Sequence, residues 1–407
     1  MKFNFILNRN YITIICFFSL VFFSSACRQS SSKKSTTGKH DTILQLSPGE
    51  VAFQDSAKLH DISEKWYNNI LKRSNFNGGI LVAKNDKIIF EKYNGFKNPS
   101  GKDSITSSTP FHIASVSKTF TAMGILKLWQ DGKLDIDKPV SDYLDSFNYP
   151  GVTIRNLLSH RSGLPNYVYF MEEAGWDKHV FIENKDVLDY LIHKKSELKN
   201  IGRPDASFNY CNTNFVLLAL IIEKTSGMKY PQFIKKTFFD PIGMKNSFVF
   251  TMNDTASITY SYDWRRRQIP LDFLDVTYGD KNIYSTPEDI LRWDMALKSN
   301  LIFKDSTLME AYSPYSNEKP GIRNYGLGWR MNIFPDGKKT IYHNGWWHGN
   351  NAVFLRVPYD GITIIVLGNV FNKLIYKAHD MLTDYDGTLD NPESEDFKNE
   401  GGDNSKE

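Results

Sequence analysis

The spacing of apolar positions changes twice along the chain and predicts the order of its secondary structure. Residues 78–96 hold two apolar runs on either side of Asn85 and Asp86, which are typical turn residues, so they predict a β-hairpin. Long apolar segments at 115–131 and 212–227 predict helices that end at glycines. Short apolar runs then predict four strands and a last helix, at 325–334, 339–345, 351–358, 361–369 and 372–384.

This order of strands, helices and strands indicates an α/β (α+β) fold. The late strands are joined by short turns, which join antiparallel neighbours, so we expect an antiparallel sheet flanked by helices. The first hairpin is expected to join the same sheet, with the helical block as an insertion. The expected sheet lobe comprises about 48–114 and 270–383, and the expected all-helical lobe comprises about 115–269.

The N-terminus reads as a targeting segment. Lys2 and Arg9 precede an apolar run at 11–23, which is too short to span a membrane and is typical of a secretory signal. The small residues before Cys27 resemble a bacterial lipoprotein box, although Ser24 stands where leucine is usual. We therefore expect residues 1–27 to be a signal peptide with a lipobox and Cys27 to carry a lipid anchor. A plain cleaved signal peptide is the alternative.

Both ends of the expected folded domain at 48–383 are polar. Residues 28–47 are expected to form a flexible tether, and the acidic residues 384–407 a disordered tail. Arg28, and not aspartate, follows Cys27. In the sorting of lipoproteins between membranes, this pattern resembles that of outer-membrane lipoproteins. We expect an exported, membrane-anchored lipoprotein of a bacterial cell envelope, on the periplasmic side of the outer membrane.

Charge and cysteine content narrow the class of protein. The net charge of +3 conceals a basic N-terminus and an acidic C-terminus, and the nearly balanced middle gives no reason to expect nucleic-acid binding. Of the three cysteines, Cys16 lies in the signal and Cys27 would be lipidated. Only Cys211 remains, so no intrachain disulfide is expected.

Ser115 and Lys118 stand three residues apart at the head of the predicted helix at 115–131. Residues at i and i+3 share a helix face, so Lys118 can reach the Ser115 hydroxyl. A helix N-terminus favours a developing alkoxide, and a lysine placed there can act as a base. The alternative is a helix cap beside a solvated lysine. Ser-x-x-Lys alone is weak, because it starts at six positions: Ser30, Ser31, Ser115, Ser196, Ser226 and Ser316.

Two further motifs follow in the chain. Tyr210 and Asn212 precede the second long helix, where a tyrosine can share proton transfer with a lysine and an asparagine can hold a lysine or a substrate amide. A predicted strand then carries His343 and Gly345, and a glycine permits close approach by a ligand. The structural alternative for Tyr210 and Asn212 is a turn followed by a helix N-cap. For His343 and Gly345 it is a turn with exposed aromatic residues.

In this order, Ser115-x-x-Lys118, Tyr210-x-Asn212 and His343-x-Gly345 resemble the three motifs of serine β-lactamases and penicillin-binding proteins. The likeness is greatest to class C β-lactamases and to the wider group of β-lactamase-related serine hydrolases. It runs from about residue 50 to about residue 370. Four other stretches carry it as well, at 157–165, 221–248, 283–293 and 325–330.

The resemblance implies a role for each motif residue. Ser115 would be acylated, Lys118 and Tyr210 would share the base role, and Asn212 would orient Lys118 and the substrate. The backbone N–H groups of Ser115 and Trp346 would form the oxyanion hole. The family uses no metal or other cofactor, and no HExxH motif is present in the chain.

The third motif departs from many β-lactamases because His343 replaces a lysine. A histidine with a pKa near about 6.5 is mostly neutral at pH 7, and so suits a substrate carboxylate less well than a lysine. This favours a hydrolase of esters or D-amino-acid peptides over an efficient β-lactamase, although Arg323 or Arg330 can restore a carboxylate contact. Cys211 stands where serine is usual and is expected to be buried and inert. His160 is expected to support a loop, because the chain has no GxSxG elbow.

The sequence thus predicts a serine hydrolase acting through an acyl-serine intermediate. Its substrate would be a small molecule or a peptidoglycan-type peptide, and an ester, a D-amino-acid peptide and a β-lactam all fit this chemistry. The alternative is a non-hydrolytic ligand-binding or regulatory envelope lipoprotein of the same fold. A purely structural envelope lipoprotein gives no reason for the ordered motifs.

Overall fold

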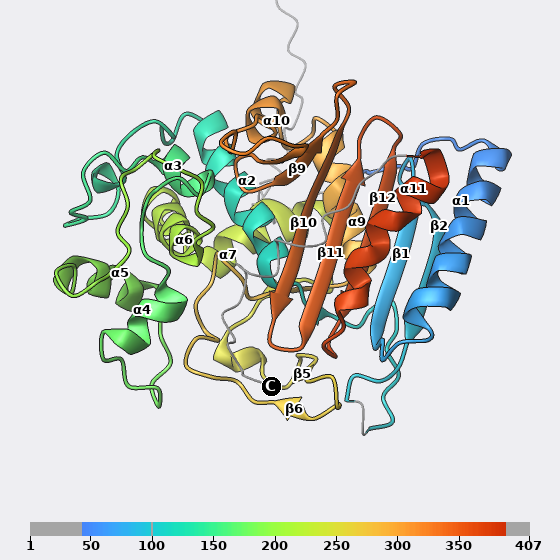
Figure 1. Cartoon of the computed structure of the whole chain (residues 1–407), viewed down its shortest axis with the longest axis horizontal. Coiled ribbons are helices and arrows are strands. Elements are labelled where there is room, and N and C mark those ends of the chain that lie inside the picture. Colours follow the sequence, from blue (N-terminus) through green and yellow to red (C-terminus); the bar gives the residue numbers. More distant parts are fainter. Residues whose placement is uncertain (1–42, 99–100, 388–407) are drawn as a thin grey trace, which may run out of the picture. The chain divides into compact units, whose positions relative to one another are not determined.

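The computed structural model describes residues 43–98 and 101–387 (Figure 1). The predicted signal peptide, the lipid anchor at Cys27, most of the tether and residues 388–407 of the acidic tail lie outside these ranges. Within them, no helix combines the length and the hydrophobicity needed to cross a bilayer.

A seven-stranded antiparallel sheet is the centre of the fold, in the order β2-β1-β12-β11-β10-β9-β8. The first hairpin joins the late strands as predicted, and the antiparallel α/β fold class is confirmed. The strands are β1 (Gly78–Lys84), β2 (Lys87–Asn94), β8 (Arg323–Tyr325), β9 (Arg330–Ile333), β10 (Lys339–Trp347), β11 (Asn350–Val357) and β12 (Ile362–Gly368).

The hairpin turn has the backbone that its sequence predicts. Asn85 and Asp86 have positive φ angles of 46° and 68°, as a two-residue turn matched to the strand twist requires. The single strand expected at 325–334 is wrong, because β8 and β9 form a hairpin there. Gly328 lies in the turn of that hairpin with a φ of 81°, and a Cβ at this position would lie 2.3 Å from the Cβ of Ala122. The strand is therefore broken where its backbone packs on a helix.

Strong alternation along the central strands divides the core in two. Ile364 and Val366 of β12 belong to one apolar cluster, and Ile365 and Leu367 belong to the other. Successive side chains of a strand point to opposite faces, so both faces of the sheet are buried. The helices α1 and α11 cover one face, and α9 lies behind the other, towards the helices that surround α2 and α6 (Figure 1).

The helices differ from prediction mainly at their ends. The segment expected at 115–131 begins as a 3-10 turn before its α-helix, and the last helix is a 3-10 turn followed by an α-helix. The α-helices are α1 (Phe53–Trp66), α2 (Ser117–Gln130), α3 (Ile154–Leu158), α4 (Tyr167–Glu173), α5 (Asn184–His193), α6 (Asn212–Ser226), α7 (Tyr230–Ile234), α8 (Asp240–Ile242), α9 (Pro287–Lys298), α10 (Asp305–Ala311) and α11 (Asp380–Asp386). The 3-10 turns beside α2 and α11 are η2 (Ala114–Val116) and η6 (Lys373–His379).

Short strands accompany the helical block that was expected to be all-helical. A three-stranded sheet has the order β3-β7-β4, and a separate hairpin joins β5 to β6. These strands are β3 (Phe111–His112), β4 (Phe248–Val249), β5 (Ser261–Tyr262), β6 (Gln268–Ile269) and β7 (Ile283–Ser285). The turn η2, which carries Ser115, contacts β10 of the large sheet and thereby brings the first and third motifs together.

Candidate active site

Ser115 lies in the 3-10 turn that precedes α2, and only 4% of its surface is exposed. The residue before it, Ala114, has a φ of 46°, a left-handed conformation that alanine rarely adopts. The N–H of Ala114 donates to His112 Nδ1 at 3.1 Å, and His112 Nε2 lies 2.8 Å from Asn282 Oδ1. Because His112 Nδ1 accepts a hydrogen bond, its Nε2 carries the proton and donates to Asn282. The strained backbone beside Ser115 is therefore held by His112, which Asn282 holds in turn.

Lys118 follows Ser115 by one helical turn and is completely buried. Its Nζ donates to Ser115 Oγ at 2.9 Å and to the backbone carbonyl oxygen of Asp280 at 2.8 Å. The spacing in the sequence therefore produces the contact that it predicted. The second acceptor belongs to a segment 162 residues away that carries none of the motifs.

Tyr210 approaches the same oxygen from the other side, and its hydroxyl donates to Ser115 Oγ at 2.9 Å. The chain is extended at Cys211, with φ −144° and ψ 115°, and α6 begins at the next residue, which fixes the direction of the tyrosine. The Lys118 ammonium lies 5.0 Å from the centre of the Tyr210 ring. The first two motifs thus converge on a single hydroxyl oxygen.

Gly345 brings the third motif against Ser115. A Cβ added at Gly345 would lie 2.4 Å from the carbonyl oxygen of Ile113 and 3.1 Å from the backbone nitrogen of Ser115. A side chain at this position is therefore incompatible with the approach of β10 to η2. The Trp346 backbone follows directly along the strand, and its indole N–H donates to the His348 carbonyl at 2.7 Å.

His343 is fully buried and hydrogen-bonded at both ring nitrogens. Its Nδ1 donates to the Asn344 carbonyl at 2.6 Å, and its Nε2 lies 3.3 Å from the Tyr325 hydroxyl. Burial, followed by the positive charges of Arg330 and Lys118, holds the pKa of His343 well below 6.5. The imidazole is therefore neutral at pH 7, as expected for a histidine here. The Arg330 guanidinium lies 5.1 Å from the centre of the Tyr210 ring and places a fixed cation close to these groups.

His160 and Cys211 both support Tyr210. The His160 ring lies 4.3 Å from the Tyr210 ring, and its Nδ1 accepts from the backbone N–H of Cys211 at 3.1 Å. Burial, then the positive charge of Lys118, keeps the pKa of His160 well below 6.5. The Cys211 thiol is buried as predicted, and burial raises its pKa to about 11. A loop-supporting His160 is thus consistent with its contacts.

Asn212 lies at the first position of α6 and is 4% exposed. The predicted role of its side chain in orienting Lys118 and the substrate stays a prediction. Sequence reasoning missed three residues that contact the motifs: His112, Asp280 and Tyr325. Of these, only Tyr325 lay in a segment that resembled the family.

Beyond these motifs, three potential metal ligands lie together: Asp272, Asp275 and His348. His348 Nε2 lies 3.1 Å from Asp275 Oδ2, and Trp347 Nε1 donates to Asp275 Oδ1 at 2.5 Å. Burial lowers the pKa of His348, but its hydrogen bond to Asp275 and the negative charges of Asp275 and Asp272 together raise it by more, so the net pKa is raised above 6.5. These contacts explain the cluster as an ion pair. The prediction that the protein uses no metal remains a prediction.

Comparison with known proteins places this geometry in a family. The Beta-lactamase family model matches residues 65–381. Penicillin-binding protein 4* of Bacillus subtilis (strain 168) is 33% identical over 314 residues, which are 73% of this chain and 69% of that protein. The chain therefore belongs to the beta-lactamase family, and homologues of penicillin-binding proteins are among its relatives. The family indicated by the three motifs is confirmed.

Solved structures share the fold at lower identity. A penicillin-binding protein from Bacillus halodurans is 24% identical, with a TM-score of 0.67 and coverage of 80% of this chain and 97% of that chain. The D-amino acid amidase from Ochrobactrum anthropi SV3 is 21% identical, with a TM-score of 0.64 and coverage of 82% and 97%. At this identity the two structures establish the β-lactamase and penicillin-binding-protein fold.

Proposed function

We propose that this protein is a serine hydrolase that forms an acyl-enzyme at Ser115 and acts on an ester or a D-amino-acid peptide or amide. The observation that carries the proposal is the convergence of the Lys118 ammonium and the Tyr210 hydroxyl on Ser115 Oγ, each at 2.9 Å. Two proton-transfer groups on one buried hydroxyl are the arrangement that an activated nucleophile needs.

In the proposed mechanism, Ser115 Oγ attacks the substrate carbonyl carbon and its proton passes to whichever of Lys118 and Tyr210 is deprotonated. The backbone N–H groups of Ser115 and Trp346 stabilise the negative charge on the carbonyl oxygen. The same pair then protonates the leaving group as the carbonyl re-forms. A water molecule, deprotonated by the same groups, attacks the acyl carbon and releases the acid and free Ser115.

The charges around the site bear on the class of substrate. His343 is neutral, so the third motif supplies no fixed charge for a β-lactam carboxylate. The Arg330 guanidinium lies beside the Tyr210 ring and can attract a substrate carboxylate more weakly. Together with the amidase among the structural neighbours, this supports esters and D-amino-acid amides or peptides ahead of β-lactams.

The first test is hydrolysis of p-nitrophenyl butyrate, D-phenylalanine amide and a chromogenic cephalosporin by the protein lacking residues 1–27. We expect turnover of at least one of the first two, a slower reaction with the cephalosporin, and loss of about 10³-fold or more in Ser115→Ala. Turnover that persists in Ser115→Ala would show that Ser115 is not the nucleophile. Tight binding without turnover, unaffected in Ser115→Ala, would instead favour the non-hydrolytic alternative.

We also propose that a lipid at Cys27 anchors the enzyme to the outer membrane on its periplasmic side. The support is the sequence pattern before Cys27, which resembles a lipoprotein box. Metabolic labelling with an alkyne fatty acid tests this proposal. We expect the full-length chain to be labelled and Cys27→Ala to remain unlabelled; equal labelling of both would refute the anchor.

A further inference from the structure

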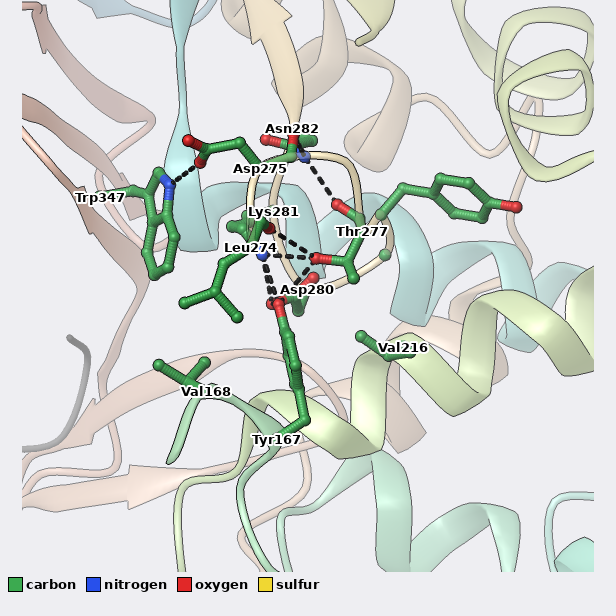
Figure 2. A network of polar contacts seen from close by, with 12 residues as sticks. Tyr167, Val168, Val216, Leu274, Asp275, Thr277, Asp280, Lys281, Asn282 and Trp347 are labelled. Atoms are coloured by element: carbon green, nitrogen blue, oxygen red, sulfur yellow. Dashed lines mark hydrogen bonds and ion pairs between the residues drawn. The ribbon is translucent and has the colours of Figure 1, made fainter. Parts of the chain in front are cut away.

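A buried ion pair lies next to the lysine of the first motif. Lys281 and Asp280 are 3% and 1% exposed, and Lys281 Nζ lies 3.4 Å from Asp280 Oδ2 (Figure 2). Neither residue belongs to a motif. The backbone carbonyl of the same Asp280 is the acceptor for Lys118 Nζ at 2.8 Å. The charged pair is thus linked to the proposed base, Lys118, through the backbone of Asp280.

Two hydroxyl groups complete what we term the Lys281 cluster, consisting of Lys281, Asp280, Tyr167 and Thr277. Lys281 Nζ donates to the Tyr167 hydroxyl and, at 2.6 Å, to Thr277 Oγ1. The Tyr167 hydroxyl donates in turn to Asp280 Oδ2 at 2.9 Å. Asp280 Oδ1 has no hydrogen-bond partner among residues 43–98 and 101–387, so the carboxylate depends on these contacts. Loss of any one of them leaves buried charge poorly compensated.

The Lys281 cluster also touches the elements that carry the other two motifs. The backbone N–H of Tyr167 donates to Thr213 Oγ1 at 2.7 Å, and Thr213 follows Asn212 at the start of α6. The Lys281 ammonium lies 4.6 Å from the ring of Trp347 (Figure 2), which follows Trp346 on β10. A cation at this distance from an indole ring is attracted to it. The cluster therefore meets α6, β10 and the Lys118 acceptor at one place.

We propose that Lys281 and Asp280 are positioning residues for Lys118: their buried pair holds the Asp280 carbonyl against the Lys118 ammonium and balances the charge beside it. The inference rests on the proposed role of Lys118 in acylation. Buried ion pairs stabilise folds poorly compared with apolar side chains of equal size, so their placement is often better explained by specificity than by stability. Here the specificity is the position of one carbonyl oxygen.

The two charges should affect the base in opposite directions. Without Lys281, the Asp280 carboxylate is uncompensated and favours the protonated base, so the acid limb of kcat/KM moves to higher pH. Without the Asp280 charge, Lys281 disfavours protonation, and the limb moves to lower pH. These signs are the same whether Lys118 or Tyr210 is the base, because either one is more acidic beside a cation.

Other titratable groups near these lysines do not produce such opposite shifts, because both variants leave them in place. His160 and His343 are neutral at pH 7, and burial, with Arg330 beside them, keeps them so. The remaining charged or titratable neighbours of the two lysines are Cys211, Tyr210, Arg330, Tyr167, His112, Asp272, Asp275 and His348.

The test compares Lys281→Met and Asp280→Asn with the wild type. Two readouts are measured against pH: kcat/KM for p-nitrophenyl butyrate, and the rate at which a fluorophosphonate probe labels Ser115 with release of fluoride. We expect each variant to lose about 10-fold or more in acylation at pH 7, and the acid limbs to shift in opposite directions. The double variant should return the limb to the wild-type pH. Shifts in the same direction, or no shift, would overturn the proposal.

A matched control separates positioning from stability. Lys84 is another buried lysine, paired with Asp360 at 2.6 Å on another part of the sheet, and Lys84→Met should lower stability without moving the acid limb. If Lys281→Met or Asp280→Asn does not fold, Thr277→Val takes its place. It should lower the labelling rate several-fold without changing net charge, and an unchanged rate would overturn the proposal. The effect of Ser115→Ala on substrate hydrolysis tests the proposed function separately. The labelling rate reports only the attack of Ser115 on the probe, so it can be measured without turnover of a substrate.

Discussion

Two clusters in this protein each pair a buried lysine with a carboxylate and a phenol, but their surroundings differ. In the Lys281 cluster, a lysine contacts the carboxylate of Asp280 and the hydroxyl of Tyr167. In what we term the Lys84 cluster, Lys84 Nζ donates to Asp360 Oδ1 at 2.6 Å and to the Tyr385 hydroxyl at 3.2 Å. Each lysine thus has a carboxylate and a phenol as partners. A lysine with these two partners therefore does not by itself show what a cluster does.

Their surroundings give them different consequences. The Lys84 cluster joins β1, the turn between β11 and β12, and α11, and Lys58 of α1 donates to the carbonyl of Tyr385 at 2.5 Å. It therefore holds together the first and last elements of the fold. The Lys281 cluster instead contacts Lys118 through a backbone carbonyl. What a buried ion pair does depends on which backbone its residues hold in place.

The largest difference in kcat/KM is expected between variants of Lys118, which the Lys281 cluster contacts, and of Lys84, which belongs to the Lys84 cluster. Lys118→Ala should lower kcat/KM by about 10³-fold or more, because it removes a group that contacts Ser115 Oγ directly. Lys84→Ala, with the same deletion of a buried cation, should leave kcat/KM of the folded protein within about two-fold of the wild type, as expected for additive distant sites. Ester hydrolysis normalised to folded protein measures both. A comparable loss in both variants would break the comparison.

A smaller and more selective difference is expected for the two phenols. Tyr167→Phe removes the hydroxyl that joins Lys281 to Asp280 and should lower kcat about 10-fold with little change in KM, because positioning is lost and binding is not. Tyr385→Phe should change neither constant. Steady-state kinetics on a single ester separates the two parameters. A rise in KM without loss of kcat in Tyr167→Phe would contradict a positioning role.

The smallest expected effect concerns stability at high pH. Burial lowers the pKa of Lys84, but its hydrogen bonds to Asp360 and Tyr385, together with the negative charge of Asp360, raise it by more, so its folded pKa lies above 10.5. The pair therefore stabilises the folded state fully below pH 10.5, and this stabilisation is lost as pH rises through the folded pKa. Lys84→Met should be less stable than the wild type by about 1 kcal/mol at neutral pH. Urea unfolding between about pH 8 and pH 11 should show the gap narrowing at the alkaline end; a gap that widens would refute this account.

Local patterns were sufficient for most of the sheet. The Asn85–Asp86 turn and the apolar runs of β10, β11 and β12 predicted strands that the structure contains, because alternation and turn residues are local signals. The break between β8 and β9 was not predicted. It results from the packing of Gly328 against Ala122 of α2, a contact between distant segments that leaves no periodic signal.

The site was predictable where its chemistry is carried by side chains in ordered motifs. Ser115, Lys118 and Tyr210 meet as their spacing and family resemblance predicted. The acceptor at Asp280 was not predictable, because a backbone carbonyl carries no residue-type signal. Lys281 stands between an aspartate and an asparagine in the sequence and belongs to none of the motifs. Lys281 is buried because α4, α6 and β10, which are distant in the sequence, pack around it.

The contact between Lys58 and the carbonyl of Tyr385 has a topological consequence. It ties the early part of α1 to the end of α11, and the two helices lie side by side on one face of the sheet (Figure 1). The start of α1 and the end of α11 are therefore neighbours although they are far apart in the sequence. A circular permutant that links these helices covalently and opens the chain at the Asn85–Asp86 turn would retain all the strand pairs, since domains whose ends lie together tolerate such rewiring. Ser115, Tyr210 and His343 would then keep their order along the new chain.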